Sequence, residues 1–434
     1  MTKKTVTVNI ILASLLSLSF SGCGGSSDDS SSGGGTPVPE TFSKSYINFI
    51  GTSARDYANA SAYDSSNNLY VVGQTKGALT ATANAGKFDM FLRKLDSNGN
   101  TVCSFQYGTA EDDIANSVAL DSQGNVYVTG WSRAAFDGHA YSGEDSILSD
   151  GGDIFVMKFD SSCQKISSAV FGTADNDLAK AISVDSSDNI YVAGEVNGAL
   201  NSQVKQGSGT SSDYYIMKLN TSLTEIWTTQ YGSTGRDTLN DMVVDNNGSL
   251  YVGGFLESDI AGVVTVVGGD DGYVAKYNTG DGSLTWITSI TDDDSASYDT
   301  VYSLALTSEN NIIAGYSLQN SGVASLDKNG TINWQKDLGG LGAKYKVAVD
   351  SNDNIYVADA GQYSKQIFKL DSSGTEIFNV VLGTSGYFEL YDINYNPNDG
   401  YVYAVGDSES DFDAPYSADN SHSGDYDGVV IKFK

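Results

Sequence analysis

Short apolar runs, separated by polar or glycine-containing turns, recur along most of the chain. The unit at residues 113–172 contains four of them, including 126–130 (VYVTG) and 153–159 (DIFVMKF). Runs of this length that are rich in Val, Ile, Tyr and Phe and are bounded by turn residues predict β-strands. Versions of the second and third runs occur seven times each, so the sequence predicts a repeat protein built from four-stranded units.

The order of these runs indicates how the repeats are arranged. The first run of the repeat region, 46–50, is of the fourth type, and the last, 429–433, is of the third type. Many of the runs are apolar at consecutive positions, as in 154–157, which is typical of strands buried on both faces. We therefore expect an all-β fold at residues 43–434, a seven-bladed β-propeller of four-stranded antiparallel blades. The N-terminal strand would complete the C-terminal blade and so remove two exposed strand edges.

The motifs of the unit resemble those of a known repeat family. The pattern reads Gly-Thr-x-x-x-Asp-x-Ala, then Asp-Ser-x-Gly-Asn-x-Tyr-Val-x-Gly, then Asp-x-Phe-Val-x-Lys-Leu-Asp. It resembles the SBBP β-propeller repeat of bacterial surface and secreted proteins. The resemblance extends over about residues 43–434, follows the pattern well in the first four blades and departs from it in the fifth and sixth. It implies the propeller fold, and it implies no single activity or substrate.

The segment before the repeats reads as an export signal. Residues 1–22 combine Lys3 and Lys4 with an apolar run that is too short for a typical membrane span. They end in FSG before Cys23, which resembles a lipobox with Phe20 where Leu is usual, so we expect Cys23 to be acylated. An ordinary secretory signal is the alternative. Residues 23–42, rich in Gly, Ser and Asp, predict a flexible tether.

Export and charge limit the partners that the chain can have. Gly24 after the cysteine favours an outer-membrane lipoprotein that faces the periplasm or the cell surface. The net charge of −30 disfavours nucleic acid and anionic membrane surfaces. It suits cationic partners or divalent ions, or it simply keeps an exported protein soluble. Contact with the membrane is therefore expected through the N-terminal lipid.

The two remaining cysteines, Cys103 and Cys163, fall in the first and second blades. Adjacent blades could bring them together, and an oxidising compartment permits a disulfide. The sequence leaves the alternative of two free thiols open, because it does not give their distance.

Acids that recur in every regular blade are expected to be structural. One set occupies the connection from the outer strand of one blade to the inner strand of the next: Asp56, Asp113, Asp177, Asp237 and Asp299. A second set opens the third strand and is expected to cap the preceding loop: Asp89, Asp153, Asp213, Asp271 and Asp427. The first set predicts hydrogen bonds to loop amides. The alternative is a ring of carboxylates at the channel mouth that attracts a cation.

Long loops join the second and third strands of five contiguous blades and are expected on one rim, where binding residues usually lie. Candidate binding residues in them are Trp131, Phe136, His139, Tyr141, Phe412, Tyr416 and His422. The last loop also carries Asp407, Glu409, Asp411 and Asp413, whose oxygen ligands suit calcium. Apart from this possible calcium site, no cofactor is predicted.

Neither histidine lies in a recognisable nucleophile motif, so the sequence favours a protein that is not an enzyme. We expect a non-catalytic binding or scaffold module for a protein or a glycan. The alternatives are a glycan-acting enzyme that uses carboxylates at the channel mouth, and an outer-membrane assembly factor.

Overall fold

A computed structural model describes the protein at residues 42–81, 83–142, 152–207, 209, 211–260, 262–266, 269–291, 298–317, 321–340, 343–361, 366–383, 386–413 and 418–434. The predicted signal peptide, the tether up to residue 41, Cys23 and Tyr416 lie outside the described residues. In the part that is described, no helix is long and apolar enough to cross a membrane.

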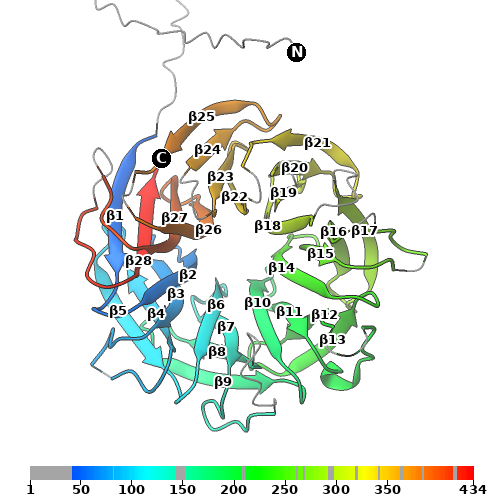
Figure 1. Cartoon of the computed structure of the whole chain (residues 1–434), viewed down its shortest axis with the longest axis horizontal. Helices are drawn as coiled ribbons and strands as arrows, with labels where there is room; N and C mark the ends of the chain where they lie inside the picture. The colour runs from blue at the N-terminus through cyan, green and yellow to red at the C-terminus, as the bar shows by residue number, and fades with distance from the viewer. Residues whose placement is uncertain are drawn as a thin grey trace, which may run out of the picture. The chain divides into compact units, whose positions relative to one another are not determined.

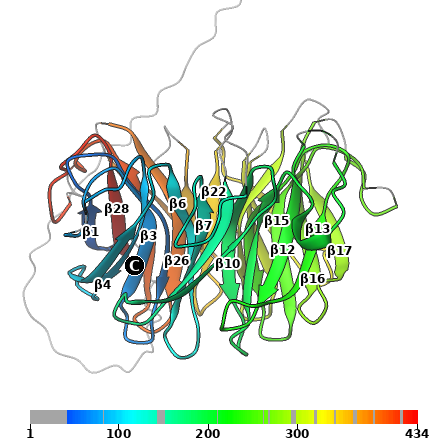
Figure 2. The same ribbon diagram turned by 90° about the horizontal axis from the view of Figure 1, so that it is seen from below.

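Seven four-stranded antiparallel sheets form a closed ring of blades (Figure 1), as the sequence predicts. Seen from the side, the strands run from one face of the ring to the other (Figure 2). Blade one is β2 (Asp56–Tyr63), β3 (Leu69–Thr75), β4 (Asp89–Leu95) and β5 (Thr101–Tyr107). Blade two is β6 (Asp113–Leu120), β7 (Val126–Ser132), β8 (Asp153–Phe159) and β9 (Lys165–Phe171).

The next four blades repeat this order, with shorter strands in blades five and six. Blade three is β10 (Asp177–Val184), β11 (Ile190–Val196), β12 (Asp213–Leu219) and β13 (Glu225–Tyr231), with a short 3₁₀ helix at Leu200–Ser202. Blade four is β14 (Asp237–Val244), β15 (Ser249–Leu256), β16 (Asp271–Asn278) and β17 (Leu284–Ile290). Blade five is β18 (Thr300–Leu306), β19 (Ile312–Ser317), β20 (Gly322–Leu326) and β21 (Ile332–Asp337). Blade six is β22 (Tyr345–Val349), β23 (Ile355–Asp359), β24 (Gln366–Leu370) and β25 (Glu376–Val381).

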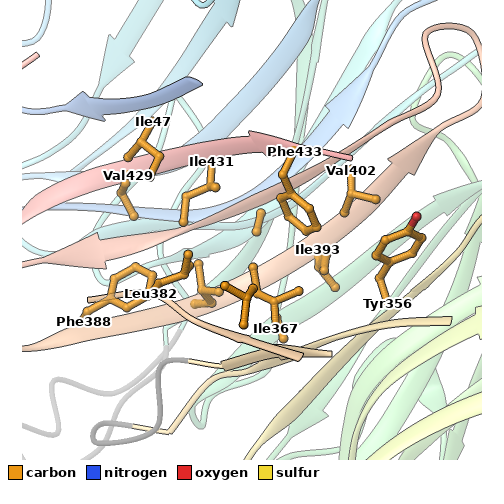
Figure 3. Close-up of a cluster of buried hydrophobic side chains, with 14 of the residues drawn as sticks. Ile47, Tyr356, Ile367, Leu382, Phe388, Ile393, Val402, Val429, Ile431 and Phe433 are labelled. Atoms are coloured by element: carbon orange, nitrogen blue, oxygen red, sulfur yellow. The ribbon is translucent and has the colours of Figure 1, made fainter. Parts of the chain in front are cut away.

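Blade seven closes the ring with strands from both ends of the repeat region. It consists of β26 (Phe388–Asn396), β27 (Tyr401–Ser408), β28 (Asp427–Phe433) and, as its outer strand, β1 (Lys44–Ile50). β1 pairs antiparallel with β28, with Ile47 opposite Ile431. Both side chains are buried in a cluster that also holds Phe388 of blade seven and Tyr356 of blade six (Figure 3). Closure therefore combines strand pairing with the burial of apolar side chains between two blades.

The outer edge of β1 is covered by the long loop of the same blade. The backbone N–H of Ile47 donates to the Asp419 carboxylate (2.8 Å), and the N–H of Asp419 donates to the Ile47 carbonyl (2.7 Å). Asn420 repeats this pattern at Phe49, because its side-chain carbonyl accepts from the Phe49 N–H (2.7 Å) and its amide donates to the Phe49 carbonyl (3.0 Å). We call residues 419–420 the clasp. A strand edge that would otherwise be open to other chains is thereby partly blocked.

A lysine in the third strand links one blade to the next. The Lys94 ammonium lies 4.9 Å from the centre of the Tyr70 ring in its own blade. It also donates to the Ser161 carbonyl (3.0 Å) in blade two. Lys432 does the same across the closure, lying 5.1 Å from the Tyr403 ring and donating to the Ser97 carbonyl (3.1 Å) of blade one. These lysines therefore stabilise contacts between blades.

Cys103 of β5 and Cys163, in the turn before β9, form a disulfide, with their Cα atoms 6.0 Å apart. Of the two alternatives that the sequence leaves open, the structure has the bonded one. The bond adds a covalent link between the first two blades.

We predict that closure carries a large share of the stability. Ile47 is 0% exposed, so the change Ile47→Ala should lower the free energy of unfolding by about 2–5 kcal/mol. It should also speed hydrogen exchange in β1 and β28. Ile166 on the outer strand β9 is 53% exposed, and Ile166→Ala should cost no more than about 0.5 kcal/mol. Denaturant unfolding checks both variants, and equal losses of stability would contradict the prediction.

Candidate functional site

A chamber of about 630 Å³ lies where the central channel opens, at the end of the ring at which the inner strands begin. We call it the mouth. All seven blades contribute to its wall, which combines three kinds of side chain. Aromatic groups come from Tyr57, Phe88, Trp131, Tyr302 and Tyr391; amides from Asn59, Gln74, Asn116 and Asn240; and charged groups from Lys180, Lys344, Lys346, Asp112 and Glu389. Its volume is in the usual range for small-molecule sites.

The wall is shaped by β-bulges. Near the start of each inner strand except β22, the hydrogen-bond ladder to the second strand of the same blade is interrupted. The register shifts between Ala58 and Ala60 in β2, and equivalent shifts occur in β6, β10, β14, β18 and β26. A bulge takes backbone groups out of the ladder and re-aims the side chain at that point. The Asn59 amide donates to the Ala115 carbonyl (2.9 Å) of the next blade. Asn116 and Asn240 make the same bond to blades three and five.

Blade three has Lys180 at this position, and its ammonium donates to the Asn240 side-chain carbonyl (3.0 Å) of blade four. Blades five to seven also depart from the asparagine pattern. The corresponding stretches of their inner strands carry Tyr302, Lys346 and Tyr391, which all line the mouth. Lys346 donates to the Tyr302 carbonyl (3.0 Å), so it links blades six and five. One side of the mouth is therefore rich in amides, and the other presents two tyrosines with a lysine on the blade between them.

Most charged groups at the mouth are matched by a charge of opposite sign. Lys180 forms an ion pair with Glu195 of β11. Lys344 lies 3.8 Å from Glu389, and Arg133 lies 3.8 Å from Asp112. Lys346 lies near Asp241 and Asp392, where burial raises both carboxyl pKa values and the ammonium partly offsets that rise.

The repeated acids of the first set bind loop amides, as the sequence predicts. Asp56 accepts from the Thr52 N–H (2.6 Å), Asp113 from that of Thr109 (2.5 Å) and Asp237 from that of Ser233 (2.5 Å). Asp177 binds the N–H of Thr173 in the same way, and Asp299 occupies the equivalent buried position. The first set is thus structural in blades one to four, where these hydrogen bonds are present.

The second set of acids caps the long loops. The Asp89 carboxylate accepts from the Ala85 N–H (3.1 Å), and Asp153 accepts from the N–H of Ser142 (2.7 Å). Asp213 and Asp427 bind loop amides in the same way. The predicted capping role is confirmed for these residues.

Of the aromatic rim candidates that the structure describes, only Trp131 lines the mouth. The prediction is wrong for Phe136 and Phe412, which are 1% and 4% exposed. Phe136 stacks on Phe155 at 4.6 Å, and Phe412 packs on Phe388 at 5.0 Å. Their loops fold back onto the blades, so both rings belong to the core.

The remaining rim candidates lie away from the mouth wall. His139 is 3.4 Å from the Ser168 hydroxyl, and the His422 ring packs edge-on against Phe49 at 5.6 Å. Tyr141 is half-buried and is not part of the wall either. None of these three side chains is placed to contact a ligand in the mouth.

The four acids predicted as calcium ligands have separate surroundings. Asp407 is buried in β27, Glu409 accepts from the Tyr387 N–H (3.3 Å), and Asp411 accepts from the His422 N–H (2.8 Å). In the described ranges, no three His, Cys, Asp or Glu side chains are grouped so that they could hold a metal ion. Asp413, the fourth predicted ligand, is therefore not part of such a group either.

Sequence reasoning missed most of the wall, including Tyr57, Tyr302, Lys346 and Tyr391. These residues lie inside the inner strands, where they look like ordinary members of an apolar run. A signal was nevertheless present, because the position that holds Asn in blades one, two and four holds Lys or Tyr in the other four blades.

The comparisons with known proteins support the same architecture. The SBBP β-propeller repeat family matches residues 104–136. The chain is a seven-bladed β-propeller that carries the SBBP repeat. This SBBP propeller is 26% identical over 165 residues to the regulatory protein FlaEY of Caulobacter vibrioides. The match covers 36% of this chain and only 17% of FlaEY.

Two solved structures share the ring. The structure of U3-55K superposes with a TM-score of 0.56 at 9% identity, covering 89% of this chain and 98% of that one. Virginiamycin B lyase from Staphylococcus aureus superposes with a TM-score of 0.55 at 10% identity, covering 91% of this chain and 99% of the lyase. At these identities the likeness shows the fold alone.

We predict that the SBBP propeller loses stability as the pH rises from 5 to 8. Burial raises the pKa of Asp113 to about 6, and that of Asp177 and Asp237 to about 7. A raised folded-state pKa stabilises the fold below the unfolded pKa, and this stabilisation disappears as the pH passes the folded value. The change should be on the order of 1 kcal/mol per acid.

Denaturant unfolding at pH 5 and pH 8 measures this change. Asp237→Asn should reduce the difference between the two pH values, since an amide does not titrate. Asp175→Asn, at an exposed position, serves as the control. A free energy of unfolding that increases from pH 5 to pH 8 would show that burial does not dominate these carboxyl groups.

Proposed function

We propose that this SBBP propeller is a non-catalytic binding module and that the mouth holds its ligand, a saccharide. The observation that carries the proposal is the composition of the chamber, with five aromatic rings and four side-chain amides on a wall built by all seven blades. Aromatic rings offer flat apolar faces, and amides offer directional hydrogen bonds, which together suit the two faces and the hydroxyls of a sugar ring.

The position of the mouth favours a preformed site. Most of its side chains project from strands, whose ladders, bulges and inter-blade bonds fix their direction; Phe88, Asp112 and Lys344 come from positions one residue before a strand begins. Sites on rigid elements lose little conformational freedom on binding. The sequence suggests a protein or a glycan as the partner, and of these two we propose a glycan, bound at the mouth.

Three observations favour binding over catalysis. Neither His139 nor His422 is on the mouth wall. Both acids on the wall, Asp112 and Glu389, lie 3.8 Å from a basic side chain. FlaEY is a regulatory protein by name, and the lyase shares only the ring at 10% identity.

Two tyrosines of one blade provide a matched test. Tyr302 lines the mouth, whereas Tyr298 is 76% exposed outside it. A glycan array should first identify bound oligosaccharides. Tyr302→Ala should then weaken binding by tenfold or more (about 1.4 kcal/mol), and Tyr298→Ala should not.

Calorimetric titration measures the affinities, and tryptophan fluorescence locates the ligand. Trp131 is at the mouth, whereas Trp227, Trp286 and Trp334 are in outer strands. A ligand-induced change that disappears in Trp131→Phe assigns the site to the mouth. Equal losses in the two alanine variants, or a signal that survives in Trp131→Phe, would place binding elsewhere.

We also propose that the chain is exported and held at the outer membrane by lipid on Cys23. Lys3, Lys4 and the apolar run before Cys23 support this proposal, as does a tether composition that allows the propeller to extend from the membrane surface.

Fractionation of cells that express the wild type and Cys23→Ala tests the anchor. The wild type should sediment with membranes and incorporate labelled fatty acid, and the variant should be released in soluble form. Cys103→Ala controls for loss of a thiol that the structure assigns to a disulfide. Unlabelled wild-type protein, or a variant that still sediments, would rule out lipid attachment at this residue.

A further inference from the structure

The charge at the mouth differs in sign from that of the whole chain. The chain has 24 Lys and Arg against 54 Asp and Glu, whereas the mouth wall has three lysines against two acids. Those two acids already lie near Arg133 and Lys344. A strongly acidic protein therefore presents a small basic site inside its channel.

Of the three lysines at the mouth, Lys346 is the one whose ammonium has hydrogen-bond donors to spare for a ligand. Unlike Lys180 and Lys344, it has no carboxylate within 4.0 Å among the residues that the structure describes. Its ammonium donates to the Tyr302 carbonyl (3.0 Å). An ammonium has three donor hydrogens, so it can still donate to a ligand oxygen.

The two carboxylates whose burial-raised pKa values Lys346 partly lowers, those of Asp241 and Asp392, are each held by a backbone N–H of the neighbouring blade. Asp241 accepts from the Leu304 N–H (2.7 Å), and Asp392 accepts from the Ser61 N–H (2.8 Å). Both line a second chamber of about 400 Å³, to which Lys346 does not contribute. Lys346 lines the mouth, together with Tyr302 and Tyr391.

We infer that the mouth prefers saccharides that carry a carboxylate, and that Lys346 determines this preference. The inference rests on the proposed function and adds the chemical class of the ligand. The rings of Tyr302 and Tyr391 come from the blades on either side of Lys346, so a sugar ring held between them places its substituents near the ammonium. A hydrogen bond between two charged groups is shorter and stronger than one between neutral groups.

Pairs of oligosaccharides that differ only at carbon six test the inference. Trimers of galacturonate and galactose, of glucuronate and glucose, and of mannuronate and mannose are titrated calorimetrically into the full chain. At least one acidic trimer should bind tenfold or more tightly than its neutral partner. Lys346→Met should bring this ratio close to one, and Lys346→Arg should preserve it. Lys328→Met, at an exposed turn outside the mouth, should behave like the wild type.

Each outcome is decisive. Equal or tighter binding of the neutral trimers would overturn the preference for carboxylates and leave the proposed function intact. A preference that survives in Lys346→Met would overturn the role of Lys346. Binding of no member of any pair would overturn both the inference and the saccharide proposal. The ratio within each pair is the readout, because a purely structural role of Lys346 would weaken both members together.

Discussion

Every feature of the mouth depends on the pairing of β1 with β28. Because the wall takes side chains from all seven blades, the chamber exists only when the ring is closed, and the ring closes only when the first strand completes the last blade. Closure is secured on three sides of β1: by the ladder to β28, by the apolar cluster against blade six, and by the clasp at its outer edge. The long loop of blade seven is thus partly a structural element, since Asp419 and Asn420 in it serve as edge partners for a strand that is more than 360 residues away in sequence.

The repeated residues and the residues that depart from the repeat have different tasks. Lys94 and its equivalents join the third strand of one blade to the turn before the outer strand of the next, and Asn59 and its equivalents join the inner strands. The first set of acids ties the connections between blades to the inner strands. A side chain that satisfies a neighbouring backbone group in this way is not free to be varied, because leaving a buried carbonyl or amide unpaired is costly. The asparagine is replaced by Lys180 in blade three and by Tyr302, Lys346 and Tyr391 in blades five to seven, so three of the four replacements lie on adjacent blades. Lys346 still donates to a backbone carbonyl of the neighbouring blade, that of Tyr302.

The sequence was sufficient to predict the fold because the fold depends on local patterns. The order of the apolar runs along the chain shows that the first and last repeat units are incomplete. It therefore also predicts that the region near Ile47 pairs with the region near Ile431, as it does. The capping acids were predictable for the same reason, since a carboxylate and its loop amide lie a few residues apart. The mouth was not predictable in this way, because the bulges shift which side chain of each inner strand faces the channel. Phe136 and Phe412 were assigned wrongly because loop position indicates exposure only when the loop does not fold back onto the blade.

The electrostatics of the channel decide what kind of ligand it can select. A net charge of −30 repels anions at long range, but at physiological ionic strength this field is screened over about 8 Å. A single ammonium on the wall of a recessed chamber acts within that distance and loses less of its attraction to screening by salt than an exposed group does. We expect the net negative charge of the chain to repel an extended polyanion along its length, whereas a short chain with one carboxylate brings a single charge to the mouth. On our proposal, a net acidic chain with Lys346 in a recessed chamber would favour small or terminal acidic groups over anionic polymers bound along their length.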